Sequence, residues 1–344
     1  MKSSIIADKE KIDIIEREKP ISDGHKVVIK VAYAGVCGSD IHYWHYGDTW
    51  AKGWIMGHEF TGYVEDPGER TDLKKGDRVL CMPSKACLEC NFCLEGKTNC
   101  CEAPLTNAIG IGTPGGFAEY VMVRSHLPQK LEDHVPFIDA TMVEPCAVGL
   151  AGARKSGVKE NDSVLVVGGG IIGLMNAMWA KKMGAKNVVL AEAGANRMDF
   201  ANKCDFIDVV IDAKSEDCQE QLLKANAGEM YDIIFECVGI KATLNGYIDV
   251  LKSGGKLMLL GVPNEEIPFR FNPIVVRNIS VIPSHAWTFE EFKDTLSELT
   301  EGNLDLRQFI TDIKPIDEIQ SVFENLASGD TKDIKVLLKV FGEE

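Results

Sequence analysis

The glycine-rich stretch from Ser163 to Glu192 constrains the fold of this chain more than any other segment. It reads SVLVVGGGIIGLMNAMWAKKMGAKNVVLAE. Residues 164–167 are wholly apolar and rich in valine, as a strand covered on both faces requires. Apolar residues recur at helical spacing over residues 171–183, and Gly184 follows them, which predicts a helix that ends there. Residues 186–191 predict a second strand, with Glu192 at its end.

The glycines between the first strand and the helix have the spacing of a dinucleotide-binding turn. Gly168 allows a tight turn, Gly170 lets the backbone approach a pyrophosphate, and Gly173 lets the helix pack closely on the strand. The N-terminus of the helix supplies amide groups and a positive dipole to the phosphates. A glycine-rich turn without a ligand is the structural alternative, but it leaves the position of Glu192 unexplained. We therefore predict that this stretch binds a dinucleotide.

The predicted cofactor contacts extend beyond the glycines. They are Gly168, Gly170, Ile171, Ile172, Gly173, Glu192, Arg197, Val238 and Gly261. The Glu192 carboxylate can accept hydrogen bonds from the ribose hydroxyls and would repel a 2′-phosphate, which favours NAD over NADP. Arg197, five residues later, could instead pair with a phosphate. We predict NAD.

Length and charge limit the possible function classes. A chain of 344 residues predicts about two domains, and its 45% apolar and 26% charged residues are typical of a soluble globular protein. The net charge of −15 argues against nucleic acid or an anionic membrane as the main partner. No run is long enough to span a bilayer, and the first residues lack the apolar core of a signal peptide. We therefore expect a cytoplasmic protein whose eleven cysteines are thiols or metal ligands.

Four cysteines have the spacing of a structural metal site. Cys87, Cys90 and Cys93 follow one another at three-residue steps, and Cys101 comes eight residues later. Three thiolates in a loop can surround one ion, and a fourth closes a tetrahedron that suits zinc and leaves no position for a substrate. Cys100 competes with Cys101 for the fourth place. Free cysteines or an iron–sulfur cluster are the alternatives.

A second, more dispersed set predicts a catalytic metal site. It consists of Cys37 in GVCGSDIHYW, His58 and Glu59 in MGHEFTG, and Glu144 in VEPCAVG. Taken singly, Cys37 could be a small core residue, His58 a buried histidine, and Glu144 an acid at a helix N-terminus. Beside a nucleotide-binding fold they form a mixed sulfur, nitrogen and oxygen set, with which a catalytic zinc keeps a coordination place for substrate.

The order of the motifs resembles that of the zinc-dependent medium-chain dehydrogenases. GVCGSDIHYW, GHEFTGYV, GDRV, the cysteine loop, GGFAEYV, VEP, GGGIIGL, FECVG and GGKLMLLG follow one another as in that family. The chain looks most like its sorbitol (polyol) and threonine dehydrogenase branch. The resemblance implies an α/β protein with a doubly wound, six-stranded parallel Rossmann sheet inserted into a GroES-like, irregular β-barrel domain. Residues 1–147 and 285–344 would form the GroES-like catalytic domain, and residues 148–284 the NAD-binding domain.

The resemblance also implies site roles and an activity. Family spacing selects Cys101 as the fourth structural ligand, so that each chain would hold two zinc ions. Cys37 and His58 would bind the catalytic zinc, with either Glu59 or Glu144 as the third protein ligand. Ser39 and His42 match the positions of a proton relay. The implied reaction transfers a hydride from a secondary alcohol to NAD in a homo-oligomer, either a tetramer or a dimer.

The resemblance is weaker around the substrate. Tyr43 matches an aromatic residue that lines the pocket in the polyol branch. The Arg–Tyr pair typical of sorbitol dehydrogenases falls on Ala286 and Trp287, so an arginine that would hold substrate hydroxyls is missing. We expect Tyr43, His285 and Trp287 near a substrate that could be another polyol, a sugar acid, an amino alcohol such as threonine, or a diol. A zinc-free reductase and a non-catalytic NAD-binding scaffold are the rival classes, but neither needs the intact ligand residues.

Overall fold

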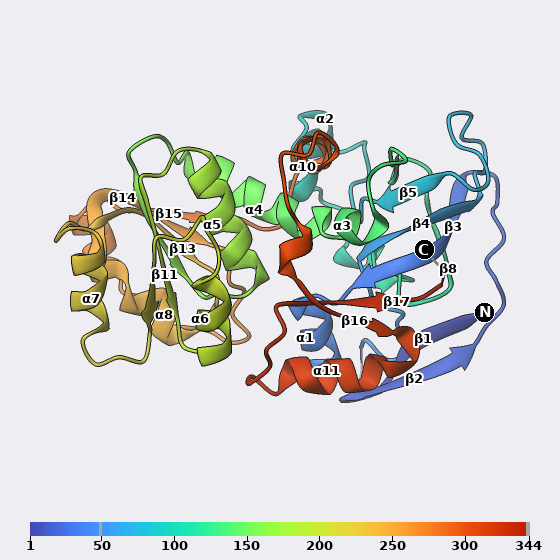
Figure 1. The fold of residues 1–344 in the computed structure, drawn as a ribbon. Helices are drawn as coiled ribbons and strands as arrows, with labels where there is room; N and C mark the ends of the chain where they lie inside the picture. The colour runs from blue at the N-terminus through green and yellow to red at the C-terminus, as the bar shows by residue number, and fades with distance from the viewer. Residues whose placement is uncertain (48–49, 342–344) are drawn as a thin grey trace. The chain divides into compact units, whose positions relative to one another are not determined.

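The computed structural model describes residues 1–47 and 50–341. The chain divides into two compact units, one of Met1–Glu144 with Thr288–Glu344 and one of Pro145–Trp287 (Figure 1). The second unit is therefore inserted into the first. The boundaries expected from the sequence, after residues 147 and 284, each lie three residues from the observed ones.

A seven-stranded sheet forms the framework of the first unit. Its strand order is β16-β17-β3-β4-β5-β9, and β8 pairs with β3 outside this path. The strands are β3 (Lys26–Gly35), β4 (Glu59–Asp66), β5 (Arg78–Cys81), β8 (Tyr120–Arg124), β9 (Pro128–Lys130), β16 (Ile310–Pro315) and β17 (Lys335–Lys339). The last segment of the chain completes this sheet, because β17 pairs antiparallel with β3. Two small sheets join β1 (Lys2–Asp8) to β2 (Lys11–Glu16) and β6 (Ala108–Ile109) to β7 (Gly112–Thr113).

The first unit also contains short helices. They are α1 (Gly38–Tyr46), α2 (Asn91–Leu94), α3 (Phe137–Thr141), α10 (Phe289–Thr300) and α11 (Ile319–Ala327), while α4 (Val143–Ser156) crosses the boundary between the units. Thr288 starts α10 through a capping box: its hydroxyl accepts the Glu291 amide at 3.3 Å, and the Glu291 carboxylate accepts the Thr288 amide at 2.7 Å. The core contains the fully buried rings of Phe60, Phe117 and Phe323.

The second unit is a six-stranded, wholly parallel sheet. Its order is β12-β11-β10-β13-β14-β15. The strands are β10 (Ser163–Val167), β11 (Asn187–Glu192), β12 (Val209–Asp212), β13 (Tyr231–Glu236), β14 (Leu251–Leu259) and β15 (Ser280–Pro283). The connecting helices are α5 (Ile171–Lys182), α6 (Ala195–Ala201), α7 (Cys218–Ala225), α8 (Lys241–Gly246) and α9 (Phe271–Val276). This confirms the predicted Rossmann fold, with the strand order reversing between β10 and β13, where such folds bind nucleotides.

One expected strand starts elsewhere. The apolar pattern of the sequence predicts this strand over residues 256–261, with Gly254 and Gly255 at its start. The strand begins at Leu251 and continues through both glycines to Leu259. Gly254 has a φ of +75°, and the pairing with β13 shifts register there. The glycines therefore mark an irregularity inside the strand rather than its start.

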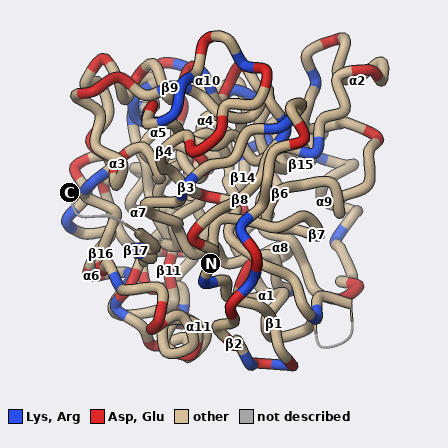
Figure 2. Tube along the Cα trace, turned by 90° about the vertical axis from the view of Figure 1, so that its right-hand side faces the viewer, with Lys and Arg blue, Asp and Glu red and all other residues tan. Residues whose placement is uncertain are grey.

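Among the described residues, none of the helices combines the length and the hydropathy that a membrane-spanning segment requires. Figure 2 shows lysine and arginine interspersed with aspartate and glutamate along the chain.

Candidate active site and metal centres

Cys37, His58 and Glu59 come together in the first unit. Their ligand atoms lie within 4.8 Å of one another. Cys37 is the N-cap of α1, and Glu59 opens β4. The pairing of β3 with β4 sets Glu59 opposite Gly35, where a Cβ would come 2.1 Å from the Glu59 carboxylate. Glycine at position 35 therefore makes the space that Glu59 occupies.

The carboxylate of Asp40 faces both Cys37 and His58. Its carboxylate accepts the Cys37 amide at 2.9 Å, and its other oxygen lies 3.6 Å from Nδ1 of His58. Asp40 is fully buried and His58 nearly so. Burial opposes a charge on His58, but Asp40 and Cys37 together raise its pKa well above the usual value. With Nδ1 facing Asp40, Nε2 is left for an ion, and a sulfur, a nitrogen and a carboxylate oxygen form a donor set that fits zinc.

Lys335 forms an ion pair with Glu59, the third residue of the group. Its ammonium donates to both Glu59 carboxylate oxygens at 2.7 Å and to the Val36 carbonyl at 3.0 Å. Lys335 is 1% exposed and Glu59 is 0% exposed. Glu144, the other candidate ligand, lies in the first turn of α4 and is among the charges that raise the pKa of Lys335. Both candidate carboxylates therefore act on one buried lysine, and Glu59 is the one grouped with Cys37 and His58.

The relay candidates lie on α1. Ser39 and His42 are both partly exposed. Burial, and then the charge of His45, lower the pKa of His42, which favours the neutral ring that can take up a proton. Burial raises the pKa of the Tyr43 phenol, which also feels the charges of His58, Asp40 and Cys37. Tyr43 lies on the same helix as Ser39 and His42.

The four cysteines of the loop form a second cluster. The sulfurs of Cys87, Cys90, Cys93 and Cys101 lie within 4.8 Å of one another, and none of these residues is in a disulfide. Backbone amides point at the sulfurs: Cys87 N–H lies 3.3 Å and Ala103 N–H lies 3.4 Å from Cys101 Sγ. Amides of Glu102 and Cys93 lower the pKa of Cys90 to about 6. Burial raises the pKa of Cys93 to about 12, so the amides favour the thiolate at Cys90 but not at every sulfur. Four sulfurs this close together fit a tetrahedral zinc. Cys100 is exposed and outside the cluster.

The glycine turn has the geometry that a pyrophosphate requires. Gly168 has a φ of +100°, and a Cβ on Gly173 would come 1.9 Å from the Gly168 carbonyl oxygen. A Cβ on Gly170, the N-cap of α5, would meet nothing within 4 Å, so that this face is open to a ligand. Glu192 ends β11, and its carboxylate accepts the Gly169 amide at 2.6 Å. The turn and the acid therefore fit a dinucleotide.

The remaining cofactor candidates lie near the same edge of the sheet. Val238 contacts Gly168, since a Cβ there would come 2.6 Å from its side chain. Glu236, at the end of β13, accepts the amides of Val238 at 3.0 Å and of Gly239 at 2.8 Å and so holds this turn. Gly261 packs on Gly239. Ile171 and Ile172 open α5, and Arg197 lies on α6; all three are partly exposed.

Comparison with known proteins decides the family. Residues 23–133 match the family described as alcohol dehydrogenase GroES-like domain, and residues 172–301 match zinc-binding dehydrogenase. D-arabinitol dehydrogenase 1 of Uromyces fabae is 33% identical over 94% of this chain and 93% of its own length. The chain belongs to the zinc-dependent medium-chain alcohol dehydrogenase family.

Solved structures agree with this family. An alcohol dehydrogenase of Escherichia coli CFT073, complexed with NADH, has a TM-score of 0.90 and 26% identity over 99% of both chains. A protein of Sinorhizobium meliloti 1021 bound to NADP has a TM-score of 0.88 and 26% identity over 98% of this chain and 99% of its own. This dehydrogenase is therefore an enzyme of the zinc- and NAD(P)-using class.

The proposed substrate residues come from different units of the dehydrogenase. Tyr43 belongs to the first unit, where its ring packs edge-on against Trp50 at 5.4 Å and Trp54 at 6.0 Å. His285 and Trp287 end the second unit. Trp287 is 3% exposed, which places most of its ring in packing.

Sequence reasoning missed two residues of this site. Lys335 has no recognisable motif, and its only signal is a cation directly before the buried run at the centre of β17. The sequence predicts only a turn-stabilising role for Asp40. Asp40 does stabilise the start of α1, but it also faces His58. An acid at the third helical position after Cys37 is the signal that could have indicated this.

The cysteine cluster gives a first testable prediction. We expect Cys101→Ser to lower the zinc content by one ion per chain and to lower the thermal midpoint, because a hydroxyl is a poor zinc ligand and the loop folds around its metal. Cys100→Ser, one residue away, should change neither. Metal analysis and thermal unfolding measure both variants. An equal loss of zinc in Cys100→Ser would contradict the assignment.

Proposed function

We propose that this dehydrogenase oxidises a secondary alcohol of a polyol or a sugar-derived alcohol to a ketone, with NAD as acceptor and two zinc ions per chain. The observation that carries the proposal is the group of a partly exposed Cys37 and the buried His58 and Glu59, whose ligand atoms lie within 4.8 Å of one another. The similarity to a D-arabinitol dehydrogenase supports a polyol. The absence of the Arg–Tyr pair, replaced by Ala286 and Trp287, argues against sorbitol itself.

Each residue of the site would have its own role in the reaction. Zinc bound by Cys37 and His58 would act as a Lewis acid that lowers the pKa of the substrate hydroxyl. Glu59, held by Lys335, would serve as the third ligand, with Glu144 as the alternative. Asp40, whose carboxylate lies 3.6 Å from Nδ1 of His58, would orient that ring. Ser39 Oγ would take the hydroxyl proton, and His42 would pass it to solvent. Glu192 and the glycine turn would hold NAD, which accepts the hydride.

A substrate screen tests this proposal. The zinc-loaded enzyme is mixed with NAD and with arabinitol, sorbitol, galactonate, threonine or 2,3-butanediol, and NADH formation is followed by absorbance. We expect the highest kcat/KM with a polyol. A higher kcat/KM with threonine would move the enzyme to the amino-alcohol class, and no turnover with any secondary alcohol would overturn the function.

The cofactor preference gives a second prediction. Glu192 is 7% exposed and ends β11, where its carboxylate would repel a 2′-phosphate. We expect kcat/KM with NAD to exceed that with NADP, and Glu192→Gln to reduce this ratio by about tenfold, since one lost charge repulsion is worth on the order of 1–2 kcal/mol at such a site. Kinetics with both cofactors measure the ratio. A wild-type preference for NADP would contradict the role of Glu192.

We further propose that the enzyme is a cytoplasmic homo-oligomer, a tetramer or a dimer. β15 ends the order of the parallel sheet, and an open edge strand can pair with another copy. On α9, the helix that precedes β15 in the chain, Phe271, Val275 and Val276 are 67%, 72% and 70% exposed. An apolar patch of this kind is typical of an interface. The eleven free cysteines support a reducing compartment.

A further inference from the structure

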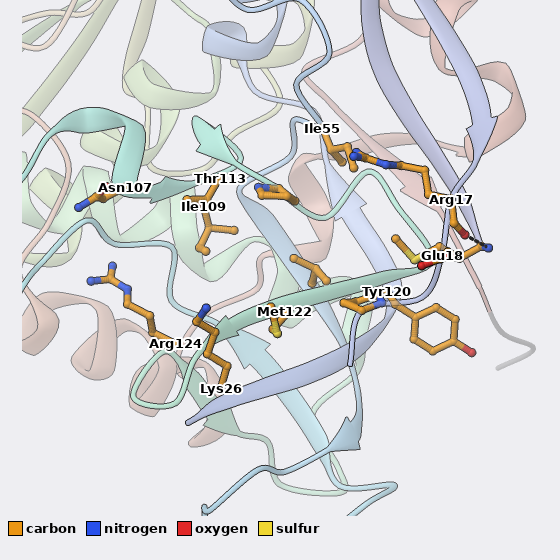
Figure 3. A pocket seen from close by; sticks show the side chains of 14 residues that line it. Arg17, Glu18, Lys26, Ile55, Asn107, Ile109, Thr113, Tyr120, Met122 and Arg124 are labelled. Atoms are coloured by element: carbon orange, nitrogen blue, oxygen red, sulfur yellow. Dashed lines mark hydrogen bonds between the residues drawn. The ribbon is translucent and has the colours of Figure 1, made fainter. Parts of the chain in front are cut away.

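A cavity of about 460 Å³ lies in the first unit, apart from the residues of the active site. It is lined by the segment after β2, the start of β3, the β6–β7 turn and β8 (Figure 3). Small-molecule sites commonly have volumes of about 300–1,000 Å³. None of the proposed metal ligands, relay residues or cofactor contacts is part of this lining.

The walls of the cavity are mainly apolar. Ile55, Ile109, Tyr120 and Met122 contribute to them, and Figure 3 shows Ile109 and Met122 between the charged side chains at the two ends. Ile55 and Ile109 are both 4% exposed, so the wall that they form belongs to the packed core. A ligand that fills this space needs an apolar body.

Two cations meet at one end of the cavity. Lys26 and Arg124 are direct cross-strand partners in the antiparallel pairing of β3 with β8. Like charges in this position repel each other. Lys26 has Asp23 at 3.5 Å, and Arg124 donates to the Ala86 carbonyl at 2.6 Å and to the Ser84 carbonyl. These contacts leave N–H groups on both side chains for an anion.

Arg17 supplies a third cation, on the other side of the cavity from Lys26 and Arg124. Figure 3 shows the Arg17 side chain extending toward Ile55. The lining also includes the N-terminus at Met1, whose ammonium pairs with Glu16 at 3.1 Å, and one carboxylate, Glu18. The lining of this cavity therefore carries more positive than negative side chains, although the net charge of the whole chain is −15. A local excess of cations attracts anions.

The cavity wall is continuous with the metal-ligand segment. The carbonyl of Ile55 accepts the Gly115 amide at 2.9 Å, and the carbonyl of Met56 accepts the Phe117 amide at 3.0 Å. His58 follows two residues after Met56. A ligand that presses on Ile55 therefore acts on the segment that leads to His58 and to the start of β4 at Glu59.

We propose that this cavity is an effector site for a small organic anion with an apolar body. The anionic group binds between Lys26 and Arg124, and the apolar body packs on Ile109 and Met122. Occupancy changes the catalytic rate through the segment from Ile55 to His58.

The test compares 1-naphthylacetate with 1-naphthylacetamide, which has the same shape without the charge. Titration calorimetry is done on the zinc-loaded enzyme saturated with NADH, so that the cofactor site is blocked. We expect one site per chain and an affinity for the acid about fivefold higher than for the amide. Equal affinities, or no binding while NADH is present, would overturn the anion site.

Variants locate the site. Lys26→Glu should weaken acid binding by about fivefold, and Met122→Trp, which fills the cavity, should abolish it. Lys203→Glu, at an exposed position of the second unit, makes the same charge change as a control and should leave binding unchanged. Equal losses in Lys203→Glu and Lys26→Glu would show a general charge effect and overturn the assignment.

Kinetics test the effector role. At saturating NAD, the acid should change kcat/KM for the alcohol at least about twofold in the wild type and not in Met122→Trp. An unchanged kcat/KM with the site occupied overturns the effector role. Because binding is measured without turnover, failure of this site is distinguishable from failure of the proposed alcohol oxidation.

Discussion

Cys37→Ser is expected to lower kcat by on the order of 10³-fold, because the loss of the thiolate ligand removes the several kcal/mol of transition-state stabilisation that a bound metal supplies. Cys37 is the N-cap of α1, where serine is a favourable residue, so the helix should still form. Steady-state kinetics measure the loss, and metal analysis should show one zinc ion per chain instead of two.

Two readouts separate a lost metal from a lost fold. NADH affinity depends on the second unit, which holds the glycine turn, and should stay within about twofold of the wild type. The thermal midpoint should also change little. Wild-type turnover in Cys37→Ser would remove Cys37 from the catalytic site, whereas a loss of NADH binding would indicate misfolding rather than a missing ligand.

Lys335→Met is expected to lower the free energy of unfolding by about 3–5 kcal/mol, since it leaves the buried Glu59 carboxylate without its cation. Both side chains of the pair are essentially inaccessible to solvent, and Lys335 donates to both Glu59 oxygens at 2.7 Å. Methionine keeps much of the volume of the lysine stem. The loss of unfolding free energy therefore measures the removal of the lysine charge rather than a change in packing. Urea unfolding measures it.

The double variant Glu59→Gln with Lys335→Met is the control. It removes both charges and should recover at least half of the lost stability, because no unpaired charge is left in the core. Zinc content should be measured alongside, since Glu59 is also a candidate ligand. If Lys335→Met were as stable as the wild type, the buried ion pair would not form in the folded protein.

Much of the fold followed from local patterns. The valine-rich strand, the glycine turn and the helix to Lys182 lie where the sequence predicts them, because each depends on residues close together in the chain. The start of β14 was wrong, because a glycine pair was interpreted as a boundary although it lies at an irregularity inside the strand. Only the register with β13 distinguishes the two cases.

The sequence by itself determined the cysteine loop and the dinucleotide turn of this dehydrogenase, since their members lie within a short segment whose backbone sets their geometry. Tertiary structure alone decided that Glu59 rather than Glu144 stands with Cys37 and His58, and that Lys335 holds it across 276 residues of chain. The antiparallel pairing of β17 with β3, and of β3 with β4, brings these residues together. A sequence pattern cannot show such a contact, because strands far apart in the chain meet only when the sheet is complete.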